Sequence, residues 1–358
     1  MNLDFALITP AGDYSASAER LKFCAQQQLF KHAVPVEFGG LGNSFLDLVE
    51  NHRQLGLVTQ DPGLILSLNA QLWGAIFPLL IFGSAEQQQR WLPGLLNGEL
   101  IAGHAITEPE AGSDTGALST HAISTKDGWL LNGSKRYITN APIADLMIVY
   151  AVEDRGLSAF IVSVDDPGVQ FKPRAQVTGC MTAPIGEVLL NDCLIPTERR
   201  LGKSGAGSQI MQSALELERA FIFAGIAGVM TRQLEAVIQF SRERRSQGKS
   251  LGQHQAISHK IAEMKVRLDT VLLWVHRCAE LKDTGKRLSL ESAQTKLFAS
   301  EAFLQSSLDT VQILGASGLL TEQPFIGFVQ DALASRLFSG SSEIQKNIIA
   351  GLLGVGLR

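Results

Sequence analysis

The segment ITEPEAGSD, residues 106–114, lies where helical sequence patterns give way to strand patterns. Its Thr, Gly and Ser residues offer hydroxyl groups and free backbone N–H groups, which suit a flavin or a phosphate. An ordinary turn has this composition about as often. The segment therefore predicts a polar loop, which becomes a ligand site if other segments support it.

The sequence around this loop, residues 101–201, has the signals of a small β domain. Asp127-Gly128 and Asn132-Gly133 predict tight hairpin turns, because Gly accepts the positive φ that such turns need. The pattern predicts a mostly antiparallel sheet, without the alternation of strands and helices that builds a parallel one. The expected strands, and the breaks between them, are 146–152, 159–164 and 187–190, with Asp166-Pro167-Gly168 and Ala183-Pro184.

Both flanks of this region have helical patterns. Ser84 and Gln87 form a capping-box pattern that starts a helix, and Pro93 or Gly94 is expected to end it. The apolar run 63–82 contains polar residues and a proline, which favours a buried core helix over a membrane span. The other expected helices are 15–31 and 45–57 before the β region, and 210–244, 255–281, 290–313 and 343–352 after it.

These patterns predict an α+β chain that is mostly α. We expect an N-terminal helical domain at residues 1–103, a middle antiparallel β domain at 104–204, and a C-terminal helical bundle at 205–358.

Composition limits the class of protein. The 358 residues carry a formal net charge of −4, with 45% hydrophobic and 18% charged residues. This balance argues against disorder and against nucleic-acid binding by phosphate neutralisation. The four cysteines form no CxxC pair, which disfavours a disulfide scaffold and a zinc site. The N-terminus lacks the basic and apolar regions of a signal peptide. We expect a reduced, cytoplasmic protein that binds no metal, nucleic acid or membrane.

Two more polar segments lie in the C-terminal half. QILGASG, residues 312–318, has small residues that let a backbone approach a ligand, although a helix C-cap at Gly315 also explains it. FSGSSEIQ, residues 338–345, can present helical N–H groups to an anion, although N-capping by Ser341 or Ser342 also explains it. Each segment taken alone favours the plain capping interpretation.

Taken together, in order and spacing, five segments resemble the acyl-CoA dehydrogenase family of flavoproteins over nearly the whole chain. The last of them resembles the family's YEGTSEIQ stretch, and the family has the same helical, β, helical domain order. The five segments are ITEPEAGSD (106–114), YITN (137–140), ERRSQGKSLGQHQAISHKIAEM (243–264), QILGASG (312–318) and FSGSSEIQ (338–345).

The resemblance implies non-covalent FAD held between two subunits, and hence a homodimer or homotetramer. In the segment 137–140, Tyr137 stands where the family usually has Trp. In the segment 243–264, Gln247 replaces an aromatic residue that often stacks near the adenine. The residues expected to hold FAD within one subunit are Thr107, Gly112, Ser113, Tyr137 and Thr139. Those expected from the neighbouring subunit, or from the last segment, are Arg244, Gln255, Gln312, Gly315, Ala316, Ser341 and Glu343.

The chemistry that the resemblance implies needs a base for the proton α to a thioester, while the flavin accepts hydride from the β-carbon. Most members place this Glu just before the Gly of the last segment, where this chain has Ser339, a poor base without an activating partner. Isovaleryl-type members place it on a helix directly before an Arg, which matches Glu218-Arg219. We expect Glu218 to be the base, because the apolar run 220–229 indicates burial and a buried Glu needs a reason. A surface Glu in a helical salt bridge is the alternative, and Glu343 is the second candidate base. Arg219 and Ser339 are expected at the substrate.

Two departures from the family pattern bear on the substrate. The chain is short for the family, and the expected base, Glu218, lies in a different segment from the base of most members. Both features resemble the branch that acts on acyl, aminoacyl or hydroxyacyl groups tethered to carrier proteins in polyketide and nonribosomal biosynthesis, and we favour that branch. A short- or branched-chain acyl-CoA dehydrogenase of catabolism is one alternative, and a flavin-binding relative without dehydrogenase activity is another. The electron acceptor stays open between an electron-transfer flavoprotein, oxygen and another acceptor.

Overall fold

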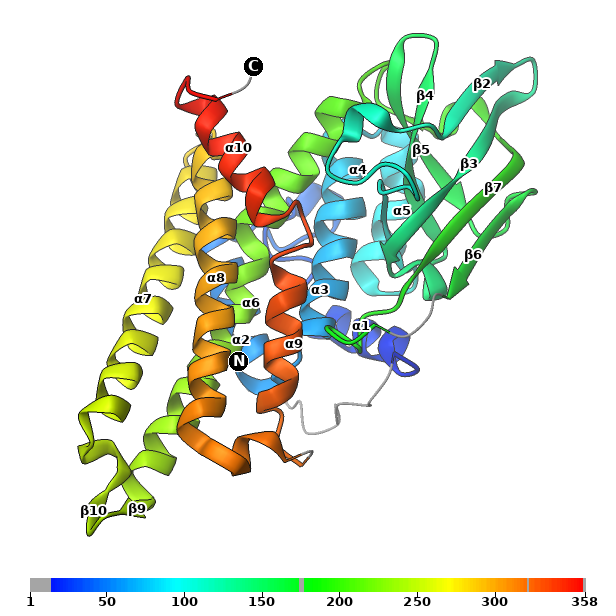
Figure 1. Ribbon diagram of the computed structural model, residues 1–358. Coiled ribbons are helices and arrows are strands. Elements are labelled where there is room, and N and C mark those ends of the chain that lie inside the picture. Colours follow the sequence, from blue (N-terminus) through cyan, green and yellow to red (C-terminus); the bar gives the residue numbers. More distant parts are fainter. Residues whose placement is uncertain (1–13, 174–176, 321, 357–358) are drawn as a thin grey trace.

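The computed structural model describes residues 14–173, 177–320 and 322–356. Helices from both ends of the chain pack side by side, and the sheet from its middle lies against one side of them (Figure 1). This is the predicted order of helices, strands and helices, so the predicted fold class is confirmed.

Within its described residues, the N-terminal part forms five short helices, and side chains cap the first turns of three of them, α2, α3 and α5. The predicted capping box at Ser84 and Gln87 is present: the Gln87 N–H donates to Ser84 Oγ at 3.2 Å, and the Ser84 N–H donates to Gln87 Oε1 at 3.0 Å. A second capping box joins Ser44 and Asp47. The helices are α1 (Ser17–Gln26), α2 (Phe45–Thr59), α3 (Pro62–Gln71), α4 (Phe77–Phe82) and α5 (Ala85–Asn97).

Helix α5 does not end at Pro93 or Gly94, so that prediction is wrong. The helix continues to Asn97 and ends at Gly98, which has a left-handed φ of 70°. Pro93 removes one helical hydrogen bond, but the apolar residues on either side of it are buried in the core. Packing of this apolar face outweighs the loss of the one bond.

The apolar run 62–82 is a helical segment inside the protein, as predicted. Its centre widens into a π turn, η2 (Leu72–Ile76), which joins α3 to α4. By length and composition this segment and α6 (Gly207–Glu243) could each cross a membrane, but 89% and 72% of their most apolar windows are buried in the fold. Both segments therefore serve as core helices here.

One eight-stranded sheet follows, in the order β6-β7-β3-β2-β4-β5-β8, with β1 paired to β4. Among the described strands, β1 and β2 run parallel to β4, and the other neighbouring pairs are antiparallel. The mostly antiparallel character is thus confirmed. The strands are β1 (Ala102–Ala105), β2 (His121–Thr125), β3 (Gly128–Thr139), β4 (Leu146–Glu153), β5 (Gly156–Ser163), β6 (Val169–Pro173), β7 (Ile185–Ile195) and β8 (Arg200–Leu201).

The two predicted hairpin turns have different outcomes. Asp127-Gly128 joins β2 to β3 as predicted. Asn132-Gly133 is not a turn, because both residues lie inside β3, where the pairing with β7 is irregular. Gly133 has a φ of 148°, and a Cβ at this position would lie 2.5 Å from Oγ1 of Thr120. The glycine therefore permits a bulge within a long strand.

Helix α6 lies at the centre of the C-terminal half and packs against α2, α3, α7 and α8. A short hairpin, β9 (Arg245–Ser246) and β10 (Lys249–Ser250), separates α6 from the next helix. The four long predicted helices are confirmed, while α9 was not predicted. The other helices are α7 (Gln255–Asp283), α8 (Ser289–Leu314), α9 (Phe325–Ser335) and α10 (Ser342–Leu352), with the 3-10 turn η7 (Gly315–Leu319) after α8.

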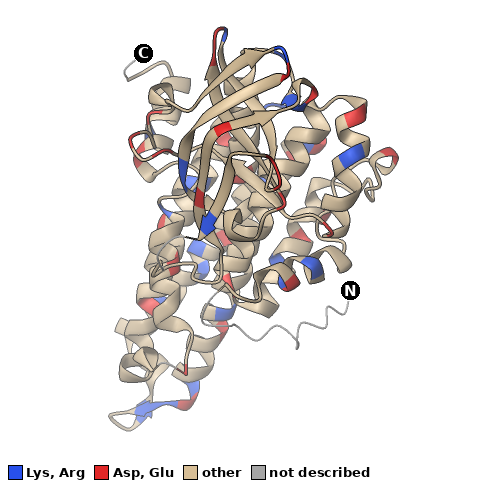
Figure 2. Ribbon diagram, turned by 90° about the vertical axis from the view of Figure 1, so that its right-hand side faces the viewer, with Lys and Arg blue, Asp and Glu red and all other residues tan. Residues whose placement is uncertain are grey.

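Charge is distributed in small groups over the surface. In the view of Figure 2, basic and acidic residues alternate along the sheet and the helices beneath it, and basic residues recur at the β9–β10 hairpin. That hairpin carries Arg244, Arg245 and Lys249, all exposed.

Candidate active site

Glu218 and Arg219 lie inside the protein, in the first half of α6. Their exposed fractions are 4% and 6%, and residues 220–230 after them are also buried. The predicted burial of Glu218 is therefore confirmed, and the alternative of a surface salt bridge is wrong. An isolated buried carboxylate is costly unless it is paired or hydrogen-bonded, so its partners define the site.

The side chain that faces Glu218 is His104, on β1. Its Nε2 lies 3.5 Å from Oε2 of Glu218, and the side chains are 13% and 6% exposed. Burial lowers the pKa of His104, and the Glu218 carboxylate raises it by a smaller amount. The sequence patterns do not single out His104 as a site residue. The available signal was a single polar side chain within an apolar strand, two residues before the 106–114 loop.

Arg219 connects α6 to the segment where most of the family carries its base. Its Nε donates to the carbonyl oxygen of Ser339 at 2.9 Å. Ser339 has a left-handed φ of 56°, and its Oγ is buried without a hydrogen-bond partner among the described residues. The structure thus brings Glu218, Arg219 and Ser339 to one region, as predicted from two separate segments.

Polar side chains of α8 hold this same segment from the other side. Lys296, fully buried, donates from Nζ to the carbonyl oxygen of Arg336 at 2.8 Å. Glu301 accepts from Nε of Arg336 at 2.8 Å and from Oγ of Ser342 at 2.7 Å. Burial, with a smaller contribution from the Arg219 charge, lowers the pKa of Lys296 to about 7. These contacts fix the backbone around Ser339.

The second candidate base, Glu343, has a different environment. It is exposed in the first turn of α10, where a hydrogen bond from its own backbone N–H and one involving Ser341 lower its pKa. Ser341 caps this helix by accepting from the N–H of Ile344 at 3.4 Å. The capping interpretation of Ser341 is confirmed, and the position of Glu343 suits a helix N-terminus better than a buried base.

The 106–114 loop is held by a buried ion pair. Nζ of Lys135, on β3, lies 2.7 Å from Oε1 of Glu108 and also donates to the carbonyl oxygen of Ile106 at 3.1 Å. Burial would raise the pKa of Glu108, but hydrogen bonds from Lys135, Thr120 and Ser119 outweigh it and lower the pKa to about 2. Burial lowers the pKa of Lys135 to about 8. The loop is therefore a fixed part of the β domain.

This fixed loop presents the residues expected to hold FAD within one subunit. Gly112 and Ser113 are exposed, and Thr107 and Thr139 are half-buried. The Arg136 N–H donates to the carbonyl oxygen of Thr107 at 2.8 Å, which joins the loop to β3. Tyr137, with a left-handed φ of 58°, has an exposed fraction of 56%. Hydroxyl and amide donors beside an exposed aromatic ring fit an isoalloxazine ring.

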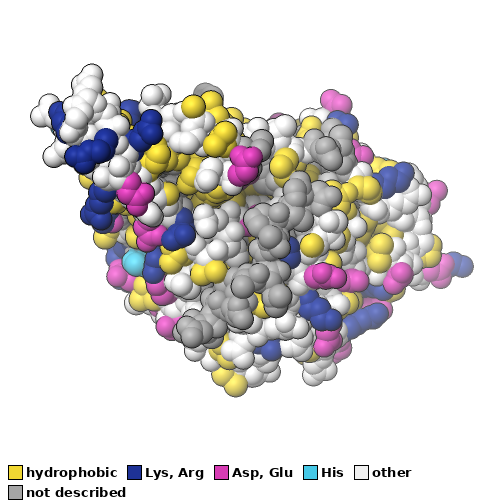
Figure 3. All heavy atoms as spheres, turned by 90° about the horizontal axis from the view of Figure 1, so that it is seen from below, with side chains coloured by type: hydrophobic (Ala, Val, Ile, Leu, Met, Phe, Trp, Pro, Cys, Tyr) yellow, Lys and Arg dark blue, Asp and Glu magenta, His cyan; other side chains and the backbone are white. Residues whose placement is uncertain are grey.

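The residues expected from a neighbouring subunit lie elsewhere. All are exposed, and they flank the β9–β10 hairpin or lie at the end of α8 and directly after it: Arg244, Gln255, Gln312, Gly315 and Ala316. In Figure 1 the hairpin and the end of α8 lie at the bottom, while the β domain lies at the upper right. From below, basic side chains gather at the hairpin end of the molecule (Figure 3). Arg244 forms no ion pair with the described residues, which leaves its charge available for a phosphate. Within one chain, the residues expected at the flavin ring and those expected from a neighbouring subunit therefore lie apart.

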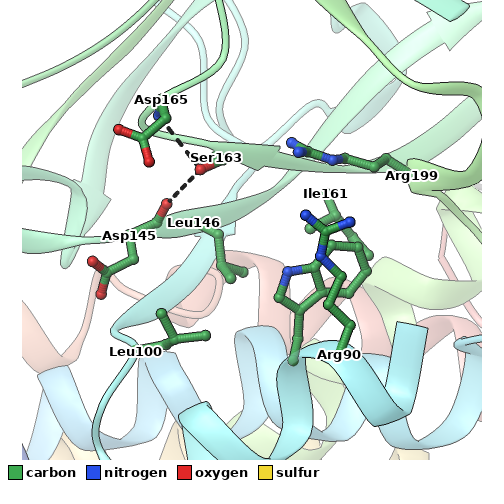
Figure 4. Close-up of a pocket in the computed structure, with 9 residues that line it drawn as sticks. Arg90, Leu100, Asp145, Leu146, Ile161, Ser163, Asp165 and Arg199 are labelled. Atoms are coloured by element: carbon green, nitrogen blue, oxygen red, sulfur yellow. Dashed lines mark hydrogen bonds between the residues drawn. The ribbon is translucent and has the colours of Figure 1, made fainter. Parts of the chain in front are cut away.

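A small pocket of about 150 Å³ lies between α5 and strands β4 and β5, and it contains none of the predicted site residues. In Figure 4 Ser163 lies between Asp145 and Asp165, with Arg199 and Arg90 on the opposite side. Ser163 Oγ donates to the carbonyl oxygen of Asp145 at 3.3 Å and accepts from the Asp165 N–H at 3.4 Å. These bonds satisfy the serine, and the pocket carries no role in the site described above.

Comparison with known proteins agrees with this geometry. The chain matches the acyl-CoA dehydrogenase N-terminal domain at residues 10–99, the middle domain at 103–193 and the C-terminal domain at 205–353. It is 37% identical over 340 residues to the L-prolyl-(peptidyl-carrier protein) dehydrogenase of Pseudomonas fluorescens, which covers 93% of this chain and 90% of that protein. It is 36% identical over 325 residues to the short-chain specific acyl-CoA dehydrogenase of Mus musculus, covering 89% and 78%.

Two solved structures are also similar. The prolyl acyl carrier protein oxidase AnaB superposes with a TM-score of 0.95 at 35% identity, covering 99% of this chain and 96% of that one. PigA with FAD and proline superposes with a TM-score of 0.93 at 34% identity, covering 96% and 91%.

The fold and these similarities identify the class of protein as a flavin-dependent dehydrogenase. The chain belongs to the acyl-CoA dehydrogenase family and is an FAD-dependent oxidoreductase.

Proposed function

We propose that this protein dehydrogenates an acyl or aminoacyl group held as a thioester on a carrier protein, with Glu218 as the base. The observation that carries the proposal is the position of Glu218. It is buried on α6, and the next residue, Arg219, contacts the backbone of Ser339, where most of the family carries its Glu. A base on α6 can therefore serve the region from which the usual base is missing.

The residues of this chain have separate tasks in such a reaction. Glu218 takes the proton from the α-carbon, and the electron pair of that C–H bond forms the new double bond to the β-carbon. FAD, when bound, supplies the acceptor for the hydride that leaves the β-carbon. Arg219 fixes the Ser339 backbone and with it the wall of the site. The buried residues after Glu218 keep water away from the carboxylate.

FAD would be held by residues of two subunits. Thr107, Gly112, Ser113, Tyr137 and Thr139 fit the ring in one subunit, because the 106–114 loop and strand β3, which carry them, are joined by a hydrogen bond from the Arg136 N–H to the Thr107 carbonyl oxygen. Ser341 and Glu343 would contribute at the start of α10. Arg244, Gln255, Gln312, Gly315 and Ala316 would reach the diphosphate and adenine from a second subunit, since they lie at the far end of the helices. This division supports a homodimer or homotetramer, and the location we propose is cytoplasmic.

The relatives favour a carrier-protein substrate over a CoA substrate. Proteins named for prolyl groups on carrier proteins are similar over nearly the whole chain, in sequence and in fold. A prolyl thioester is therefore the first acyl group to test, and the pathway we propose is nonribosomal or polyketide biosynthesis. A short-chain acyl-CoA dehydrogenase is the second candidate, because the murine enzyme is nearly as similar. Electrons would leave through oxygen or an electron-transfer flavoprotein.

The test is anaerobic reduction of the bound flavin by a matched set of thioesters. The set contains prolyl and butyryl groups, each on a carrier protein and on CoA. We expect bleaching to be fastest with prolyl-carrier protein. Faster bleaching by butyryl-CoA would replace the proposal with the second candidate. A flavin that no thioester reduces would contradict both.

A further inference from the structure

His104 and Glu218 form an isolated contact in the interior. The imidazole Nε2 lies 3.5 Å from Oε2 of Glu218. Oε2 of Glu218 and Nδ1 of His104 are both buried without a hydrogen-bond partner among the described residues. Hydrogen bonds in active sites are often long before substrate binds and shorten afterwards. The pair is therefore placed to form one strong bond.

The surrounding elements hold the His104 ring in position. His104 lies on β1, paired with Ile148 on β4, and the π turn η2 packs against it. A Cβ added at Gly74 of η2 would lie 3.0 Å from Cγ of His104, so the absence of a side chain there makes room for the ring. A π turn in a core helix frequently marks a functional site.

Few other charges act on this pair. On α6, Arg219 follows Glu218 and Glu216 precedes it, and on α8 Lys296 faces Arg219. Lys135 of β3 is occupied by Glu108. Tyr150 of β4 is buried, and burial raises its pKa. The α3 helix and the η2 turn contribute no titratable side chain. Glu218 is thus the charged group that acts on His104.

We propose that His104 is a positioning residue for Glu218. Its Nε2–H donates to Oε2 of the carboxylate, which fixes the orientation of the carboxylate and leaves Oε1 to accept the α-proton. The imidazole proton stays on Nε2 throughout, so the step needs no further reactant. This inference rests on the assignment of Glu218 as the base under the proposed function.

The first test compares two substitutions of His104. His104→Phe fills the space without a donor, and His104→Gln keeps an N–H donor of similar reach. The measurement is the rate constant of anaerobic flavin reduction by one thioester across the pH range in which all variants stay folded. For His104→Phe we expect the acid limb of the rate profile to move up by about one pH unit, because the ionised carboxylate loses its donor. The rate constant on the alkaline plateau should stay unchanged in His104→Phe. In His104→Gln the acid limb of the profile should lie at the same pH as in the wild type.

The control is His52→Gln. His52 is another buried histidine, whose Nε2 contacts the carbonyl oxygen of Leu29. Its substitution should leave the acid limb in place. A matching shift in His52→Gln, or an unshifted limb in His104→Phe, would overturn the proposal. Equal losses at every pH in both His104 variants would show a purely structural role and would also overturn it.

A second readout is independent of turnover. The protein has seven histidines, and the NMR signal of His104 is assigned by its loss in His104→Gln. In Glu218→Gln the imidazole should titrate at lower pH than in the wild type, because the carboxylate raises the pKa of His104. Identical titration in both would contradict the contact. The two proposals fail differently. Fast flavin reduction in Glu218→Gln would reject Glu218 as the base. Slow flavin reduction in Glu218→Gln, together with an unshifted acid limb in His104→Phe, would reject only the role of His104.

Discussion

Arg219 and Ser339 are 120 residues apart in the sequence, and a hydrogen bond joins them. Ser339 occupies the position of the usual base, and Glu218 lies beside Arg219 on the neighbouring helix. Under the proposed function, a carboxylate supplied from α6 serves the same small region as one supplied from the segment before α10. Either α6 or the segment before α10 can carry the base, because a proton transfer requires only that the base lie within hydrogen-bond reach of the α-carbon.

At this scale we predict the effect of Glu218→Gln. The amide keeps the volume and the contact with His104 but cannot accept the proton. Flavin reduction by substrate should slow by about 10²–10⁴-fold, the usual contribution of a positioned base, while FAD content stays unchanged. Rapid anaerobic mixing measures the rate. Ser339→Ala and Glu343→Gln are the matched controls and should have much smaller effects. Near-normal reduction in Glu218→Gln would reject it as the base.

Strand β3 carries both Lys135, which anchors the 106–114 loop, and Tyr137, which is expected at the flavin. Its pairing with β7 is irregular between Lys135 and Ile138, so the strict alternation of the strand is interrupted there. Lys135 consequently points inward to Glu108, while Tyr137 is exposed beside the 106–114 loop. A β-bulge re-aims side chains in this way, and here it allows one strand both to hold the loop and to present an aromatic ring.

For this element we predict that Lys135→Met destabilises the protein by about 3–5 kcal/mol, because Glu108 is left as an unpaired buried charge. The measurement is the free energy of unfolding in urea, and the FAD affinity should fall with it since the loop loses its anchor at Ile106.

The matched control for that substitution is Lys265→Met. Lys265 pairs with Asp269 on the surface of α7, with both side chains about half exposed. Such a pair contributes less than about 1 kcal/mol. A loss of similar size in both variants would mean that the buried pair has no special role.

The whole molecule divides the expected FAD contacts between two distant ends. The β domain carries the set that fits the flavin ring, and the hairpin and the end of α8 carry the set expected at the diphosphate (Figure 1). A second copy of the chain would supply the second set of expected FAD contacts, since closed symmetric oligomers are the norm among soluble proteins.

At this scale we predict that Arg244→Ala weakens FAD binding without altering the chemical step. A charge-assisted contact with the diphosphate contributes about 1.5–3 kcal/mol, which corresponds to roughly 10- to 150-fold in affinity. FAD content after dialysis measures the loss, and ultracentrifugation should show a dimer or tetramer with about one FAD per chain.

Arg245→Ala is the control, because Arg245 is an exposed neighbour on the same hairpin. Unchanged FAD retention in Arg244→Ala would remove Arg244 from the site. A monomer that binds FAD fully would contradict the shared site as a whole.

The sequence by itself determined the order of helices, strands and helices, the capping box at Ser84 and the burial of Glu218. These depend on local chemistry: periodicity, a hydroxyl three residues before an amide, and an apolar run. Local chemistry misled at Pro93 and at Asn132-Gly133, where core packing and a strand bulge overrode the usual breakers. The exact domain boundaries stay a prediction.

Only the tertiary structure decided which groups meet. The contact between His104 and Glu218, and that between Arg219 and Ser339, join segments more than a hundred residues apart. No local pattern encodes them, because they arise from how β1, α6 and the segment before α10 pack. The role of a histidine in an apolar strand can be inferred only when the structure shows that the facing helix carries a buried carboxylate.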